Sequence, residues 1–270
     1  MDGTLAIIGT GRIGEALLRG LLHSSWLAPS QVICTDASPE RAEEVARLHG
    51  VTGTTDNRAA VEAADVVLVA LKPQVLVRVI SAVGDAFRPD QTVISVAAGI
   101  TTATIQDAIP GEVPVVRVMT NTPVQVDEAM SVLSGGTHAR DRDLDVAETI
   151  LSHVGQVIRM DEEHLDAVTA LSGSGPAYFF LLAEAMIDAG ILLGLPRDVS
   201  SQLIIQTMVG SAKMLRDAGK HPVELREMVT SPGGTTIAAI RTLESAKVRA
   251  AFLDAIEAAK LRSEELGARS

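Results

Sequence analysis

The chain has 270 residues, of which 47% are hydrophobic and only 2% are aromatic. This length allows one large or two modest domains, with a core built mainly from Ala, Val, Leu and Ile. The formal net charge is −11. Such acidity argues against nucleic acid as the main partner, because a nucleic-acid-binding protein has to neutralise phosphates.

Cysteine use and hydropathy point to the cytoplasm. Cys34 is the one cysteine, and it falls in a predicted strand, so the chain has no internal disulfide and suits a reducing compartment. No signal-peptide pattern opens the sequence. The apolar stretch after Pro176 is interrupted by Glu184 and Asp188, so we expect neither a transmembrane helix nor a membrane partner.

The first part of the chain alternates between short apolar strands and helices. Strands are expected at residues 5–8, 32–35, 66–71, 92–96, 115–119, 130–133 and 156–160. Helices are expected at 13–22, 39–48, 75–87, 101–109 and 144–153. This alternation predicts an α/β fold, a Rossmann-like doubly wound sheet.

The pattern changes near Asp161, after which no convincing strand follows. Helices are expected at 165–171, 177–193, 200–218, 223–228, 236–243 and 247–266. We therefore predict two domains, residues 1–161 for dinucleotide binding and residues 162–270 all-helical.

A glycine motif supports the prediction that the first domain binds a dinucleotide. Gly9, Gly11 and Gly14 form G-x-G-x-x-G directly after the first strand, where the next helix begins. In this context the glycines allow a tight turn, a close approach to a pyrophosphate and close packing of helix on sheet. The alternative is the same turn without a ligand.

Asp36 ends the second predicted strand, where an acid usually accepts the ribose 2′-hydroxyl of NAD and repels a 2′-phosphate. Ser38 and Arg41 follow it and would tolerate that phosphate. Arg41 is equally well explained as part of a solvated helix face. NADH is therefore plausible and NADPH remains open.

Other candidates lie at the ends of later strands, where open α/β sheets bind ligands. Small residues there would let a flat nicotinamide approach the backbone. The full set of cofactor-binding candidates is Gly9, Thr10, Gly11, Arg12, Ile13, Gly14, Asp36, Ser38, Asn57, Ala70, Lys72, Pro73, Ala97 and Gly99. A solvent-exposed lysine is the alternative for Lys72.

A second glycine signal lies between Thr230 and Thr236, which reads Thr-Ser-Pro-Gly-Gly-Thr-Thr. Ser231 is expected to cap the next helix, with Pro232 in its first turn. Free amides at such a helix start attract an anion. The segment has no Lys or Arg, which suits a small carboxylate better than a polyphosphate.

The remaining sequence features give no evidence for a further functional site. The six histidines form no metal-binding spacing, so no metal is expected. Residues 171–176, LSGSGP, lack the spacing of a nucleophile elbow and suggest a flexible turn before a helix. Phe179 and Phe180 are expected to be core residues.

Taken with these motifs, the chain resembles the pyrroline-5-carboxylate reductase family of proline biosynthesis. The strongest match is PVELREMVTSPGGTTIAAIRTLE, residues 222–244. ALSGSGPAYFF (170–180), DEAMSV (127–132), AAGIT (97–101) and Lys72-Pro73 are also similar. The resemblance covers nearly the whole chain.

The resemblance implies reduction of 1-pyrroline-5-carboxylate to L-proline by NADPH or NADH. It also implies a homodimer built by the helical domains, which in this family often assembles further into a decamer of five dimers. The active site would then be made from the nucleotide domain and helices near the dimer interface. The substrate carboxylate would bind the amides around Ser231, Gly233, Gly234 and Thr235. The Thr236 hydroxyl would bond the ring nitrogen, and the proton would come with the substrate or from water.

Two departures from the family stand out. NADPH-preferring members tend to have an Asn-Arg-Ser/Thr run where this chain has Asp36-Ala37-Ser38, which questions the usual NADPH preference. Many members have Met-Pro-Asn where this chain has Met119-Thr120-Asn121, a change that should leave the pocket intact.

Two other functions are alternatives for this sequence. A reductase of the 6-phosphogluconate or hydroxyisobutyrate dehydrogenase type would need a catalytic lysine, but Lys213 lacks the surrounding glycine-rich pattern. A non-catalytic nucleotide sensor would bind NAD(P)H without turnover, and it would have no need for a second anion site.

Overall fold

A computed structural model describes residues 3–267, which divide into two compact units. The first unit runs to Ser174 and includes the chain again from Ala259, and the second unit is Gly175–Ala258. The sequence places the change of character at residue 161, where the last strand has ended. That domain boundary stays a prediction.

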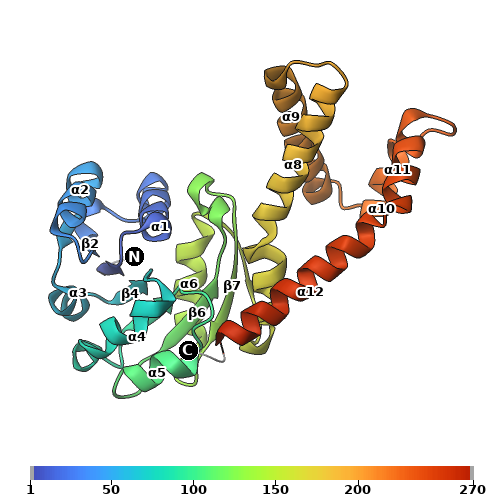
Figure 1. Cartoon of the computed structure of the whole chain (residues 1–270). Coiled ribbons are helices and arrows are strands. Elements are labelled where there is room, and N and C mark those ends of the chain that lie inside the picture. Colours follow the sequence, from blue (N-terminus) through green and yellow to red (C-terminus); the bar gives the residue numbers. More distant parts are fainter. Residues whose placement is uncertain (1–2, 268–270) are drawn as a thin grey trace. The chain divides into compact units, whose positions relative to one another are not determined.

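The first unit is built on one eight-stranded sheet in the order β3-β2-β1-β4-β5-β6-β7-β8 (Figure 1). Its strands are β1 (Leu5–Ile8), β2 (Val32–Thr35), β3 (Thr52–Thr54), β4 (Val66–Val69), β5 (Thr92–Ser95), β6 (Val115–Met119), β7 (Ala129–Gly135) and β8 (Gly155–Arg159). All neighbours are parallel except β6 and β7, which are antiparallel. The chain order reverses at β1, which pairs with both β2 and β4 and so creates the switch point where such sheets bind ligands.

Helices cover both faces of the sheet, which explains why the strands are apolar throughout. Leu5 and Ile7 pack with α1 (Arg12–His23), α2 (Pro39–His49) and α6 (Asp141–Ser152) on one face. Ala6 and Ile8 pack with α3 (Asn57–Ala63), α4 (Pro73–Ser81) and α5 (Thr102–Ala108) on the other. The predicted doubly wound fold is confirmed.

Three details differ from the sequence prediction. Strand β3 and helix α3 were not predicted, because β3 is only Thr-Gly-Thr and α3 has seven residues. The helix expected at 75–87 ends at Ser81, and a 3-10 turn, η2 (Gly84–Ala86), follows. Gly84 lies so close to the neighbouring helix that a Cβ there would be 2.9 Å from the Ala108 carbonyl oxygen.

The first unit ends in helical structure rather than a turn. After β8 come η4 (Glu162–His164), α7 (Leu165–Val168) and a π-helical turn, η5 (Thr169–Gly173), which leads into α8 (Gly175–Leu192). The flexible turn expected at residues 171–176 is therefore wrong. Gly173 allows this path, because a Cβ there would lie 2.3 Å from Met119 Cε.

Two polar anchors hold these helical segments to the rest of the first unit. Glu162 accepts hydrogen bonds from Thr102 N–H at 2.8 Å, from its hydroxyl at 2.6 Å and from Arg117 Nη1 at 3.0 Å. In the last turns of α12 (Val248–Gly267), the Ser263 hydroxyl donates to Asp166 Oδ1 at 2.6 Å. The end of the chain is thus part of the first unit.

The second unit is all-helical, and no described residue after Arg159 is in a strand. It contains α8, α9 (Arg197–Asp217), α10 (Pro222–Met228), α11 (Thr235–Ser245) and the first part of α12. Helices α8 and α9 pack against each other. They lie close together at Gly190, where a Cβ would be 2.5 Å from the Ser200 hydroxyl oxygen.

The second unit exposes much of its apolar surface in the single chain. Phe179 is 61% exposed, Phe180 is 68% exposed and Leu192 is 87% exposed. The prediction that both phenylalanines are core residues is wrong for the isolated chain. By length and composition the helical stretch Glu162–Leu192 would also suffice to cross a membrane, so Glu184 and Asp188 do not rule that out as the sequence suggested.

Candidate active site

The cofactor-binding candidates gather where the parallel strands end. Gly9 to Gly14 follow β1, Asp36 and Ser38 follow β2, and Asn57 opens α3 beyond β3. Ala70, Lys72 and Pro73 follow β4, and Ala97 and Gly99 follow β5. Because β1, β2, β4 and β5 are adjacent and parallel, these residues share one edge of the sheet.

The three motif glycines meet different surroundings. Gly9 has a φ of +96°, a conformation that other residues rarely adopt. A Cβ at Gly14 would lie 2.1 Å from the Gly9 carbonyl oxygen, so only glycine lets the helix start this close to the strand. A Cβ at Gly11 would meet no protein atom within 4 Å. Gly11 thus faces open space, as a residue beside a bound pyrophosphate should.

The start of α1 leaves its amides available. Gly11 is the N-cap and makes no side-chain cap, and the first intrahelical bond runs from Glu15 N–H to the Gly11 carbonyl at 2.9 Å. The amides of Arg12, Ile13 and Gly14 come before that bond. They can therefore donate to an anion that also benefits from the helix dipole.

The carboxylate of Asp36 is held in a fixed position. Its Oδ2 accepts hydrogen bonds from the Thr10 hydroxyl at 3.0 Å and the Thr10 amide at 3.3 Å. Its Oδ1 accepts from Ser38 N–H at 3.1 Å. The carboxylate lies at the end of β2, where the ribose of a dinucleotide reaches in this fold.

The remaining candidates have structural roles as well. The Ser38 hydroxyl caps α2 by accepting from Arg41 N–H at 3.2 Å. The Asn57 side chain accepts from the Thr35 hydroxyl at 2.6 Å. Lys72 is the N-cap of α4 and is exposed. Gly99 has a φ of +76° and, like Gly11, faces open space.

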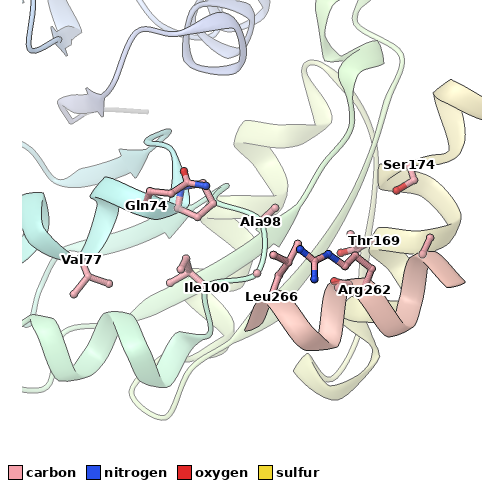
Figure 2. Close-up of a pocket in the computed structure, with 12 residues that line it drawn as sticks. Gln74, Val77, Ala98, Ile100, Thr169, Ser174, Arg262 and Leu266 are labelled. Carbon is pink, nitrogen blue, oxygen red and sulfur yellow. The ribbon is translucent and has the colours of Figure 1, made fainter. Parts of the chain in front are cut away.

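A cavity of about 680 Å³ within the first unit continues from this edge (Figure 2). It is lined by Pro73, Gln74, Val77, Ala98, Gly99, Ile100, Thr169, Ser174, Ala259, Arg262, Ser263 and Leu266. Figure 2 shows Gln74 on α4 and Arg262 on α12 on opposite sides of it. The cavity joins the cofactor candidates Pro73 and Gly99 to residues from the end of the chain.

Sequence reasoning missed the part of this lining that comes from the chain's later segments. Thr169, Arg262 and Leu266 belong to no motif, and nothing in the sequence shows that α12 returns to the first unit. Gln74 on α4 was missed as well, although it directly follows the cofactor candidates Lys72 and Pro73 in the sequence.

The loop between α10 and α11 holds the substrate candidates in the second unit. Gly233 has a φ of +67°, and Gly234 N–H donates to the Ser231 carbonyl at 3.1 Å to close a tight turn. The helix expected at 236–243 is confirmed, but the prediction that Ser231 caps it, with Pro232 in its first turn, is wrong. Gly234 is the N-cap of α11, because the turn postpones the helix to Thr235.

This delayed start leaves the first amides of α11 open. Gly234 makes no side-chain cap, and the first intrahelical bond runs from Ala238 N–H to the Gly234 carbonyl at 3.4 Å. The amides of Thr235, Thr236 and Ile237 precede it, as the corresponding amides do in α1. The loop itself, residues 231–235, is largely exposed, and Thr236 is half-buried.

Other chemistry finds little support within the described residues. They contain no group of three or more His, Cys, Asp or Glu that could hold a metal. Cys34 is a buried free thiol, and burial raises its pKa to about 12. A protonated, inaccessible thiol is not a nucleophile.

Comparisons with known proteins match both parts of the chain. Residues 162–266 match the family model for pyrroline-5-carboxylate reductase dimerisation. Residues 4–99 match the model for NADP oxidoreductase, coenzyme F420-dependent. The sequence is 43% identical over 267 residues to pyrroline-5-carboxylate reductase of Corynebacterium melassecola, which covers 98% of each chain. It is 39% identical to the Arabidopsis thaliana enzyme, over 97% of this chain and 95% of that one.

Solved structures agree over the full length. Pyrroline-5-carboxylate reductase of Coxiella burnetii superposes with a TM-score of 0.93 at 35% identity, over 98% of this chain and 99% of that one. The Plasmodium falciparum pyrroline carboxylate reductase, solved with NADP bound, superposes with a TM-score of 0.88 at 26% identity, over 98% of both chains.

Proposed function

Since the chain belongs to the pyrroline-5-carboxylate reductase family, we propose that it reduces 1-pyrroline-5-carboxylate to L-proline, the last step of proline biosynthesis. It is an NAD(P)H-dependent oxidoreductase that acts on a C=N bond. The observation that carries this function is the identity of 43% across 98% of both chains to an enzyme of that name. The open glycine turn after β1 and the open start of α11 support it chemically.

The first unit binds the dinucleotide. Bound NADH or NADPH supplies a hydride for the substrate's C=N carbon. The amides of Arg12, Ile13 and Gly14 hold the pyrophosphate, and Asp36 orients the ribose next to the adenine. Pro73, Ala97 and Gly99, at the ends of β4 and β5, lie where a nicotinamide ring can approach the backbone closely.

The loop 231–236 binds the substrate. Its carboxylate accepts hydrogen bonds from the open amides at the start of α11 and is stabilised by the positive end of that helix. The turn made by Ser231, Gly233 and Gly234 exposes these amides, and Thr235 provides the first of them. Holding both reactants in a reactive arrangement supplies a large part of the rate acceleration.

Thr236 is the catalytic candidate. Its hydroxyl hydrogen-bonds the ring nitrogen and so orients the C=N bond toward the hydride donor. The loop contains no Asp, Glu or His. The proton that the nitrogen needs therefore comes with the substrate, as its protonated imine, or from water.

The active enzyme is a homodimer, or a decamer of five such dimers, in the cytoplasm and without a membrane partner. The match of residues 162–266 to a dimerisation model supports a self-association role for the second unit. The exposed apolar side chains of α8 suit the same role, because a second copy would bury them. The unpaired thiol of Cys34 is compatible with a reducing compartment.

An assay of NADH and NADPH oxidation with 1-pyrroline-5-carboxylate, at matched cofactor concentrations, tests the function. We expect reduced cofactor to be consumed and L-proline to accumulate in equal amounts. Cofactor binding without any turnover would contradict the proposal and favour a nucleotide sensor.

A further inference from the structure

Arg41 is the basic side chain that the sequence offers for a ribose 2′-phosphate, but the structure shows it occupied. Its Nε and Nη2 donate to the Thr10 carbonyl at 3.1 Å and 3.0 Å. Its Nη1 donates to Glu44 Oε2 at 2.8 Å, and Nη2 also bonds Glu15. These four hydrogen bonds use most of the five N–H groups of a guanidinium.

The two carboxylates hold Arg41 from both sides. Glu15 follows the last motif glycine on α1, and Glu44 lies one turn further along α2 from Arg41. Glu15 is itself fixed by a contact of 3.2 Å between its Oε1 and His49 Nε2. The Arg41 and Glu15 side chains are only 27% and 29% exposed, so this pair is better shielded from water than an ordinary surface ion pair.

The proton equilibria agree with this arrangement. Burial alone would raise the pKa of Glu15, but the hydrogen bonds from Arg41 and His49 lower it below its usual value. Hydrogen bonds to Glu44 and Glu15 raise the pKa of Arg41. Both pKa shifts favour the charged forms of Glu15 and Arg41, so the attraction between these two groups persists at neutral pH.

Thr10 connects this ion cluster to the cofactor site. Its amide and hydroxyl donate to Asp36, while its carbonyl accepts from Arg41. Asp36 is thus directed toward the ribose, and Arg41 is directed toward the backbone of the glycine turn. A phosphate on the ribose would meet a fixed negative charge and a guanidinium that is already bonded.

We propose that Glu15 and Glu44 determine the cofactor preference, by holding Arg41 against Thr10 so that Asp36 selects the unphosphorylated ribose of NADH. This inference rests on the proposed function only for the cofactor class, a nicotinamide dinucleotide. Glu15 and Glu44 act through Arg41 and are positioning residues.

Equilibrium titration of NADH and NADPH without substrate tests the proposal, with cofactor fluorescence as the signal. The native protein should bind NADH about tenfold more tightly than NADPH, or better. The Glu15→Gln/Glu44→Gln variant should lose most of that preference, through tighter NADPH binding. The matched control is Asp145→Asn/Glu148→Gln, which removes the two acids around Arg159. It makes the same change in net charge and should leave the ratio unaltered.

Arg41→Met in both backgrounds identifies the group responsible. In the native background it should leave the NADH-to-NADPH affinity ratio within about twofold, because Arg41 does not reach the phosphate. Added to Glu15→Gln/Glu44→Gln, it should abolish the gain in NADPH affinity. If the double variant unfolds, Glu44→Gln alone serves, because the Glu44 side chain is 53% exposed; it should give a smaller gain.

Three results would overturn the proposal: a native protein that does not prefer NADH, a folded Glu15→Gln/Glu44→Gln protein with the native affinity ratio, or a loss of NADPH binding on Arg41→Met in the native background. Neither involves the imine substrate. A protein that follows the predicted binding pattern but fails to reduce 1-pyrroline-5-carboxylate would contradict the proposed function and leave this inference standing.

Discussion

The two units of the chain differ in where they bury their apolar side chains. The first unit encloses its sheet between two sets of helices, and it contains all the buried apolar side chains among the described residues except Leu225. The second unit leaves Phe179, Phe180 and Leu192 exposed. The first unit thus has a core of its own, whereas the second depends on burial that one chain does not supply.

The proposed ligand sites show a parallel contrast between helix starts. Helices α2, α3 and α5 are capped by the side chains of Ser38, Asp56 and Thr101. Helices α1 and α11 begin at Gly11 and Gly234, without a side-chain cap. A glycine N-cap costs only about 0.3 kcal/mol of helix stability relative to a good side-chain cap, and it leaves the first amides open to a ligand.

Gly14→Ala should have the largest effect, a loss of stability of the first unit. Its new methyl group would meet the Gly9 carbonyl oxygen at 2.1 Å, a backbone atom with no room to move. We expect a loss of about 3 kcal/mol or more in the free energy of unfolding. Gly11→Ala is the control, because its methyl group faces open space. It should keep the fold and weaken cofactor binding, as thermal melts and cofactor titrations would show. Equal melting temperatures for the two variants would contradict this account.

Phe180→Asp, in the second unit, should weaken dimerisation rather than the fold of the single chain. A charge on the exposed face of α8 would be buried in the proposed dimer, at a cost of roughly 2–3 kcal/mol or about 100-fold in the dimer dissociation constant. Leu48→Asp, on the first unit, is the matched control, since Leu48 is 61% exposed and Phe180 is 68% exposed. Sedimentation equilibrium measures both. Dissociation of the Leu48 variant, with an intact Phe180 variant, would reverse the roles of the two units.

Thr236→Ala should leave both units folded and lower kcat/KM by about one to two powers of ten, the scale of a lost hydrogen bond to a charged group. Thr242→Ala is the control on the same helix, because the Thr242 hydroxyl bonds only the Ala238 carbonyl within α11. Steady-state kinetics with both substrates give the values. Unchanged kinetics for Thr236→Ala would remove this residue from the mechanism.

Asp36→Ala should have the smallest effect, confined to cofactor choice in the first unit. It removes the acceptor for the ribose hydroxyl, so NADH affinity should fall about tenfold relative to NADPH. Titration with each cofactor checks this ratio. If the ratio stays the same, Asp36 does not read the ribose.

Much of the fold follows from the sequence because burial and pattern agree there. The apolar runs that became β1 and β4 lie in the centre of the sheet, where both faces are covered. The missed strand β3 has no apolar alternation, and its Gly53 is there because a Cβ would lie 2.2 Å from the Ala42 carbonyl oxygen. That contact is tertiary and invisible in the sequence. Helix α3 was detectable, since Asp56 caps it by accepting from Ala59 N–H.

The candidate site, too, could be predicted from the sequence only in part. The glycine turn and Asp36 could be recognised because each backbone requirement is local. The N-cap of α11 was misassigned to Ser231, because a turn closed by Gly234 N–H on the Ser231 carbonyl competes with capping by Ser231. The contribution of Arg262 to the cavity and the ion cluster at Arg41 depend on long-range packing, which no local pattern encodes.

The claim on which the rest depends is that the open amides at the start of α11 hold the carboxylate of the substrate. A crystal structure of the enzyme with L-proline bound tests it most directly. We predict the proline carboxylate within hydrogen-bonding distance of the amides of residues 235–237, with its ring nitrogen beside the Thr236 hydroxyl. Proline bound at another place, with these amides open to water, would contradict the account.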